Sequence, residues 1–153
     1  MIHITIPGEP VAQGRARFST MNGFVRAYDP QKSREYKGYV KDMASGHFKP
    51  LEGAIMMLAI FYRSIPKSWS KKKQAEALAM AIMPVSKPDA DNYLKSVKDA
   101  LNGILYRDDS QIVCPIPLKA YSDKPRVELY LATNIQWQHA LESLKQIVEG
   151  ETY

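Results

Sequence analysis

Apolar and polar residues follow one another along this chain in patterns that predict both strands and helices. Residues 2–6 alternate isoleucine with His3 and Thr5, which is the period of a strand with one buried face. Residues 54–62 form a nearly continuous apolar run, long enough for a strand buried on both faces. The stretch from Gly8 to Asp29 shows no such period, and we expect it to be a loop.

Other segments repeat apolar residues at helical spacing. Asp29 and Pro30 are typical of a helix cap followed by a first-turn proline. Ser68 or Ser70 can cap the next helix, whose apolar residues recur as far as Ile82 and predict a buried stripe. The predicted helices cover about residues 29–45, 70–82, 91–102 and 135–149.

A pair of strands is predicted after the third helix. Residues 112–121 and 126–133 are separated by four turn-forming residues, a pattern that favours an antiparallel hairpin. Pro115 and Pro117 cannot donate backbone hydrogen bonds, so the first of these strands must lie at a sheet edge or contain a bulge.

The order of these elements predicts an α+β fold, in which a small mixed β-sheet is covered by helices. No repeat or linker divides the 153 residues, and 45% of them are hydrophobic, which suffices for the core of a single domain spanning residues 1–153.

Positive charge is concentrated in the first half of the chain. The net charge is +5, and residues 1–50 and 51–86 carry 8 and 5 basic residues against 4 and 2 acidic ones. Such a distribution favours binding to nucleic acid, although a basic pI is also common in small proteins without such a partner.

Two groups of cations are candidate phosphate contacts. Arg15, Arg17 and Arg26 lie near glycine and phenylalanine residues, a combination suited to forked phosphate contacts and base stacking. A simple surface loop is the alternative. Lys71, Lys72 and Lys73 begin the second helix, where they are either solvated or neutralised by an outside anion.

The chain has one cysteine, Cys114, in a strand-like segment, and a reducing compartment is therefore expected. There is no signal-like N-terminus, and the apolar run 54–62 is too short to cross a bilayer. These features predict a cytoplasmic protein without a membrane partner.

Acidic residues flank the third predicted helix. Asp89 and Asp91 lie at its start, and Asp108 and Asp109 follow its end after a short turn. If the turn folds back, three carboxylates would meet and repel one another until a cation such as Mg²⁺ or Mn²⁺ joined them. Lys95, one turn after Asp91, would offset charge there. The alternative assigns these residues to helix capping, turn formation and ion pairs within the helix.

Four stretches of the chain resemble the RusA family of Holliday-junction endonucleases, which phages and prophages often carry. They are GEPVAQGRARFS, SWSKKK, KPDADNYLKSVKDALNG and YRDDSQIV, of which the last two are the more specific. The resemblance covers about residues 2–133, and a helical extension of about residues 135–149 lies beyond it.

The resemblance implies a homodimer that makes paired nicks in four-way junctions or branched DNA during recombination and repair. It also implies that Asp89, Asp91 and Asp109 bind Mg²⁺ and that Lys95 is catalytic. The competing hypothesis is a basic DNA-binding module without catalysis. An enzyme acting on nucleotides or RNA has less support, because no phosphate-cradling GxxxxGK[ST] loop occurs.

Overall fold

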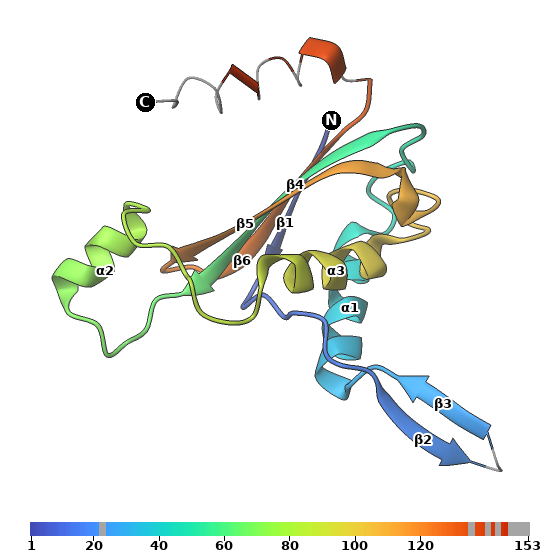
Figure 1. Ribbon diagram of the computed structural model, residues 1–153, viewed down its shortest axis with the longest axis horizontal. Helices are drawn as coiled ribbons and strands as arrows, with labels where there is room; N and C mark the ends of the chain where they lie inside the picture. Colours follow the sequence, from blue (N-terminus) through green and yellow to red (C-terminus); the bar gives the residue numbers. More distant parts are fainter. Residues whose placement is uncertain (22–23, 135–136, 140–141, 143–144, 147–153) are drawn as a thin grey trace.

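A computed structural model describes residues 1–21, 24–134, 137–139, 142 and 145–146 of the chain. Its centre is a four-stranded mixed sheet against which two helices, α1 (Gln31–Ala44) and α3 (Ala90–Leu101), are packed (Figure 1). The predicted α+β fold class is therefore confirmed. The strands of this sheet, in the spatial order β1-β6-β4-β5, are β1 (Ile2–Pro7), β6 (Arg126–Ala132), β4 (Ile55–Ser64) and β5 (Ile112–Ser122).

The pairing of the last two strands differs from the prediction. β6 pairs with β1 and β4 in antiparallel fashion, whereas β5 pairs only with β4, in parallel. β4 thus lies between β5 and β6, and the predicted β5–β6 hairpin is wrong. Three residues, 123–125, cross the end of β4, since two strand spacings of about 4.8 Å each are within their extended reach.

The edge position predicted for the proline-bearing strand is confirmed. β5 is an outer strand, and Pro115 and Pro117 stand opposite Met57 and Ala59 of β4. Residues two apart direct their backbone N–H groups to the same side of a strand, so both missing donors are lost from one side only. An outer strand such as β5 has one unpaired side, where missing donors cost no ladder hydrogen bond.

β4 is the central apolar strand, but it is fully buried on one face only. Ile55, Met57, Ala59 and Phe61 are buried, while the residues between them are half-buried. The expectation of two buried faces was wrong because the helices cover one face. Alternation in β1 is as predicted, with its three isoleucines in the core.

The three helices form where the sequence predicts them, with differences at their ends. They are α1 (Gln31–Ala44), α2 (Lys71–Leu78) and α3 (Ala90–Leu101). Asp29 does not cap α1, because Pro30 is the N-cap residue and no side chain bonds there. Ser70 caps α2 by accepting a hydrogen bond of 3.3 Å from the Lys73 amide.

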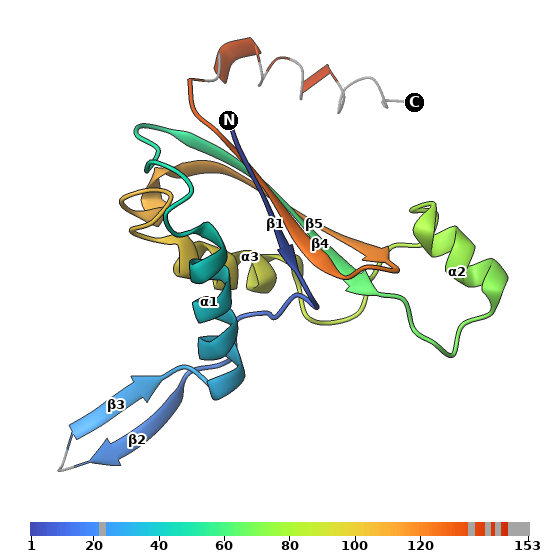
Figure 2. The ribbon, with the colours of Figure 1, turned by 180° about the vertical axis from the view of Figure 1, so that it is seen from behind.

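The apolar stripe expected on α2 is not buried. Within this helix only Ala77 is buried, and Leu78 is 51% exposed. α2 lies at the periphery of the molecule in both views (Figures 1 and 2). Its neighbourhood is joined to the sheet by Trp69, whose ring meets that of Tyr121 at 5.2 Å.

The stretch predicted as a loop contains a two-stranded antiparallel sheet, so that prediction was wrong. β2 (Arg17–Met21) pairs with β3 (Phe24–Tyr28), and the pair projects away from the body of the molecule (Figures 1 and 2). The pair Asn22-Gly23 in the sequence is a strong signal for a tight hairpin connection. Phe18 on this hairpin is 70% exposed.

The predicted C-terminal helix of about residues 135–149 falls largely outside the described residues.

A short segment before β2, residues 11–16, crosses α3, and we call it the strap. The Gln13 amide donates to the Asn92 carbonyl oxygen at 2.9 Å, and the Gly14 amide donates to Ser33 Oγ at 3.0 Å. A Cβ on Gly14 would lie 2.8 Å from both Pro30 Cγ and Ser33 Oγ. Glycine is therefore required where the strap meets the start of α1.

Replacing Gly14 by alanine tests this close approach. We expect Gly14→Ala to lower the free energy of unfolding by about 1–3 kcal/mol, because the Pro30 ring cannot yield easily. Gly38→Ala is the matched control: Gly38 lies inside α1 with open space around it, and alanine there should stabilise the protein by about 1 kcal/mol. Urea unfolding followed by circular dichroism measures both changes, and equal effects would contradict the packing described here.

Candidate metal centre and nucleic-acid interface

Of the acidic residues singled out in the sequence, Asp91 lies in the first turn of α3 and Asp89 is its N-cap residue. The helix buries Tyr93, Leu94, Val97 and Leu101 against the sheet and α1. Tyr93 stacks on Phe61 of β4 with ring centroids 5.2 Å apart. Because this apolar face of α3 is buried, its opposite, polar face is exposed to solvent.

The chain folds back after α3, as the convergence of the acidic residues requires. Gly103 adopts φ +75°, and its amide donates to the Tyr106 carbonyl oxygen at 2.8 Å. The buried Tyr106 hydroxyl in turn donates to the Lys98 carbonyl oxygen at 2.9 Å. This turn leads directly into the 3₁₀ turn η1 (Asp109–Gln111) beside α3.

Asp108 and Asp109 are adjacent but have different surroundings. The Asp108 carboxylate caps η1 by accepting a hydrogen bond of 2.9 Å from the Ser110 amide. Hydrogen bonds from Ser110 hold the pKa of Asp108 below its usual value. Asp109 instead faces α3, where Lys98 Nζ lies 3.3 Å from its carboxylate oxygen. The carboxylate of Asp108 thus stabilises the turn, whereas that of Asp109 points towards α3.

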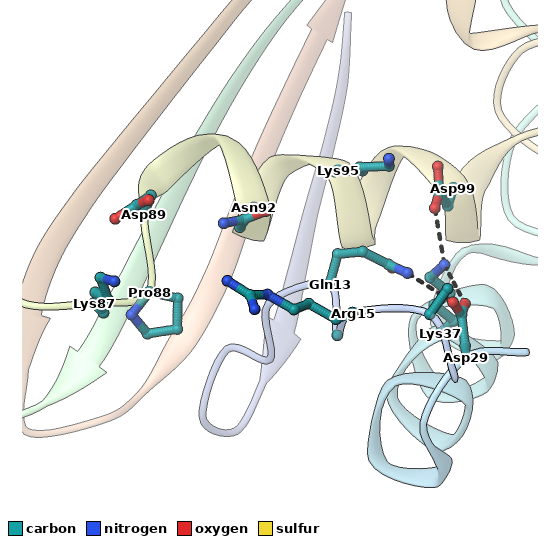
Figure 3. Close-up of a pocket in the computed structure, with 12 residues that line it drawn as sticks. Gln13, Arg15, Asp29, Lys37, Lys87, Pro88, Asp89, Asn92, Lys95 and Asp99 are labelled. Atoms are coloured by element: carbon teal, nitrogen blue, oxygen red, sulfur yellow. Dashed lines mark hydrogen bonds and ion pairs between the residues drawn. The ribbon is translucent and has the colours of Figure 1, made fainter. Parts of the chain in front are cut away.

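Two neighbouring pockets run along the outer face of α3. The smaller pocket, of about 300 Å³, is lined by Asp91, Leu94, Lys95, Lys98, Asp99 and Asp109. The larger pocket, of about 760 Å³, is bounded by α3, the strap and the start of α1 (Figure 3). Lys95 and Asp99 line both pockets, so the two pockets adjoin along α3.

Four cations line the larger pocket, and one of them is fully engaged. Lys37 Nζ lies 2.8 Å from Asp29 and 2.8 Å from Asp99, and thereby ties α1 to α3. Asp29 also accepts a hydrogen bond of 2.8 Å from the side-chain amide of Gln13 in the strap. The hydrogen bond from Lys37 lowers the pKa of Asp29. Figure 3 shows this network at one end of the pocket.

The other three cations of this pocket are Arg15, Lys87 and Lys95. All three are exposed, and none forms an ion pair with a residue in the described part of the chain. The guanidinium group of Arg15 extends from the strap towards Pro88 and Asn92 (Figure 3). These three side chains are therefore available to an anionic ligand.

The structure brings the predicted metal ligands together only in part. Asp91 and Asp109 share the smaller pocket, whereas Asp89 lines the larger one. Residues 1–21, 24–134 and the few described beyond them contain no group of three acidic, histidine or cysteine side chains placed to hold an ion. The expected three-carboxylate cluster is thus not formed, since like charges repel and Lys98 attracts Asp109.

The available donors nevertheless suit a hard divalent cation. Asp89 is the N-cap residue of α3, yet its side chain makes no capping hydrogen bond, which leaves its carboxylate oxygens free. The ion-coordinating groups of the smaller pocket are carboxylate oxygens, the ligands that Mg²⁺ and Mn²⁺ prefer. These donors are of the kind that suits Mg²⁺, and Asp91 and Asp109 present them within one pocket while Asp89 lines the adjoining one.

Lys95 does not form the ion pair within the helix that was its alternative interpretation. Asp99, one turn further along, is bound by Lys37 instead, and Lys95 extends between the two pockets. It is therefore placed next to both the acidic and the basic part of the surface.

The other predicted DNA contacts lie elsewhere. Arg17 begins β2, and Arg26 pairs with Ser19 across the projecting hairpin, while their side chains lie outside the described part. The lysines at 71–73 line neither pocket, and Lys73 Nζ lies 4.1 Å from the centroid of the Trp69 ring. Within the described chain, no helix is long and apolar enough to cross a membrane.

Several residues of this surface were missed by sequence reasoning. Gln13, Lys37, Lys87 and Asn92 line the larger pocket, and Asp29 was assigned to a helix cap. Lys87 and Asn92 flank the acidic pair in sequence, a position that was a usable signal. Lys37 gave no signal, because its partner Asp99 is 62 residues away.

Comparison with known proteins shows which family the chain belongs to. Residues 7–132 match the family described as Endodeoxyribonuclease RusA. The chain is also 48% identical over 135 residues to a protein of Bacillus subtilis (strain 168) named "Uncharacterized protein YqaN", covering 85% of this chain and 94% of that protein. The matched segment includes α3, η1, the strap and all strands except most of β1. The chain therefore belongs to the RusA family of endodeoxyribonucleases.

Proposed function

We propose that the protein is a divalent-metal-dependent, structure-selective endodeoxyribonuclease that resolves Holliday junctions and other branched DNA. The observation that carries this proposal is the pair of adjoining pockets on α3. One pocket presents the carboxylates of Asp91 and Asp109, and the other presents three cations without acidic partners among the described residues. Metal-assisted phosphodiester hydrolysis needs a metal site with a phosphate site beside it.

In this proposal Asp91 and Asp109 hold the ion together with Asp89, and Mn²⁺ can replace Mg²⁺. A bound divalent ion supplies Lewis acidity to the attacking water and to the departing 3′-oxygen. Binding of the ion would bring the three carboxylates together, because a divalent charge would relieve their mutual repulsion, and Asp109 would then exchange its contact with Lys98 for the metal.

The basic side chains bind and orient the DNA strand. Lys95 lies between the pockets, where it can hold the scissile phosphate against the metal site as a catalytic residue. Arg15 and Lys87 border the larger pocket and would contact the neighbouring phosphates, Arg15 with its forked donors. Arg17, Arg26 and the lysines 71–73 are proposed as separate contacts to other parts of the junction.

We further propose that the active form is a homodimer that makes paired nicks. A two-fold axis would present two identical sites to two strands of a four-way junction, whose arms are related by a similar axis. Sedimentation velocity at micromolar concentration tests this part, and a monomer both with and without junction DNA would rule it out.

The competing hypothesis is a basic DNA-binding module in which the aspartates only cap and stabilise turns. That role is filled by Asp108, whereas the carboxylate of Asp89 makes no capping bond. Incubating the protein with a labelled four-way junction, with and without Mg²⁺, separates the hypotheses. We expect paired nicks only with the metal, and a bound but intact junction in both lanes would favour the module.

The adjacent aspartates provide a matched pair of variants. We expect Asp109→Asn to lower the rate of junction cleavage roughly 10³-fold, which corresponds to about 4 kcal/mol of lost metal-assisted stabilisation. Asp108→Asn removes the same charge but keeps an acceptor for the Ser110 amide, and its cleavage rate should stay near that of the unaltered protein. Single-turnover cleavage at saturating protein measures both, and equal rates for the two variants would remove Asp109 from the metal site.

Arg15 provides a separate test of the phosphate site. We expect Arg15→Ala to weaken junction binding and to reduce the slope of log K against log salt concentration by about 1, because one phosphate contact is lost. Arg34→Ala, an equal loss of charge at an exposed site on α1 away from both pockets, is the control. Fluorescence anisotropy in Ca²⁺ at several salt concentrations gives these slopes, and identical slopes for the two variants would exclude Arg15 as a phosphate contact.

A further inference from the structure

The segment that carries Asp89 into the site is held by cations rather than by regular secondary structure. Lys119 of β5 donates from Nζ to the carbonyl oxygens of Ser86 at 2.9 Å and of Pro88 at 3.1 Å. Arg63 of β4 adds longer contacts from Nη1, at 3.2 Å to Ser86 Oγ, 3.3 Å to the Lys87 carbonyl oxygen and 3.4 Å to that of Ser86. The two cations thus bind three consecutive carbonyl groups.

Together with the first hydrogen bond of α3, these contacts engage the four backbone carbonyl groups of residues 86–89. The Asp89 carbonyl oxygen accepts the first hydrogen bond of the helix, from the Tyr93 amide at 3.3 Å, and the three carbonyls before it are held by Lys119 and Arg63. The Asp89 carboxylate, in contrast, accepts no bond from any residue in the described part of the chain. Its position therefore depends on the backbone to which it is attached.

Lys119 is an unusual lysine for this structure. In the sheet it stands opposite Phe61, whose ring stacks on Tyr93 of α3, so its side chain leaves the sheet on the face that carries α3. It is partly buried and forms no ion pair with a described residue, although lysines away from solvent are usually paired with acids. Its charge is instead directed at two carbonyl groups, as charge-assisted hydrogen bonds.

We propose that Lys119, assisted by Arg63, is a positioning residue for the metal site. It fixes the backbone at residues 86–88 on the sheet, so that the Asp89 carboxylate is held where it can join Asp91 and Asp109 on the cation. Residues that do not touch the metal but hold a ligand in its orientation commonly have a large effect on metal affinity. This inference rests on the proposed function, because it assigns Lys119 to the metal site named there.

The test compares Lys119→Met, which removes the donor but keeps the length of the side chain, with Lys119→Arg, which restores a donor. Lys49→Met makes the same charge change at an exposed position outside both pockets and is the control. Mn²⁺ affinity is measured on the DNA-free protein by electron paramagnetic resonance, and the Mg²⁺ concentration for half-maximal junction cleavage is measured in parallel.

We expect Lys119→Met to weaken Mn²⁺ binding and to raise the half-maximal Mg²⁺ concentration, each by about tenfold. Lys119→Arg should recover most of that loss, and Lys49→Met should behave as the unaltered protein. Junction affinity in Ca²⁺ should change by less than about twofold in all three, because Lys119 is committed to carbonyl groups and not to phosphate.

A double variant identifies the route by which Lys119 acts. If Lys119 acts through Asp89, the double variant Asp89→Asn/Lys119→Met should bind Mn²⁺ no more weakly than the single variant Asp89→Asn. The losses of Mn²⁺ affinity in the two single variants would then not be additive. Additive losses, or an unchanged Mn²⁺ affinity in Lys119→Met, would overturn the inference. If Lys119→Met does not fold, Arg63→Lys, which shortens the second cation, should shift the same two readouts in the same direction, and no shift would likewise overturn it.

The failure of this inference is distinguishable from failure of the proposed function. If the unaltered protein cleaves junctions with Mg²⁺ and Lys119→Met responds to the metal identically, only the positioning role is rejected. If the unaltered protein neither binds Mn²⁺ nor cleaves, the proposed function itself is rejected.

Discussion

The packing of α3 against β4 is the constraint on which the rest of the candidate site depends. Phe61 stacks on Tyr93, and Val97 and Leu101 are buried without measurable exposure. Burying one stripe of a helix fixes the direction of every other residue on it, because side chains follow the helical period. The rotation of α3 therefore decides that Asp91 and Lys95 face solvent together.

Polar contacts then fix what this apolar packing leaves free. The strap is tied to α3 through Gln13, and Lys37 joins α1 to α3 through two carboxylates. On the other side, Lys119 holds the carbonyl groups that precede Asp89. Each of these contacts comes from a different element, so the strap, α1 and β5 are all connected to α3 or to the segment that leads into it.

Neighbouring residues of the same type have different tasks at this surface. Asp108 stabilises η1 as its cap, whereas Asp109 is directed to the smaller pocket. In the same way Lys37 forms two ion pairs, with Asp29 and Asp99, while Lys95 forms none with the described residues. Charged side chains at this surface therefore fall into two groups: those that form hydrogen bonds or ion pairs within the fold, and those that have no such partner among the described residues.

What the sequence determined by itself was mostly local. Periodicity placed β1, β4 and the three helices, and Gly103 ended α3, because these features depend on residues a few positions apart. Resemblance to a family in the segments KPDADNYLKSVKDALNG and YRDDSQIV predicted Asp89, Asp91 and Asp109 as metal ligands, because a family pattern carries tertiary information that no local pattern holds. The tertiary structure alone decided that β4 separates β5 from β6 and that Lys37 meets Asp99. The strand order depends on which apolar faces can be buried together, and the Lys37–Asp99 pair depends on which distant charges then become neighbours. Residues close together in the sequence specify neither outcome.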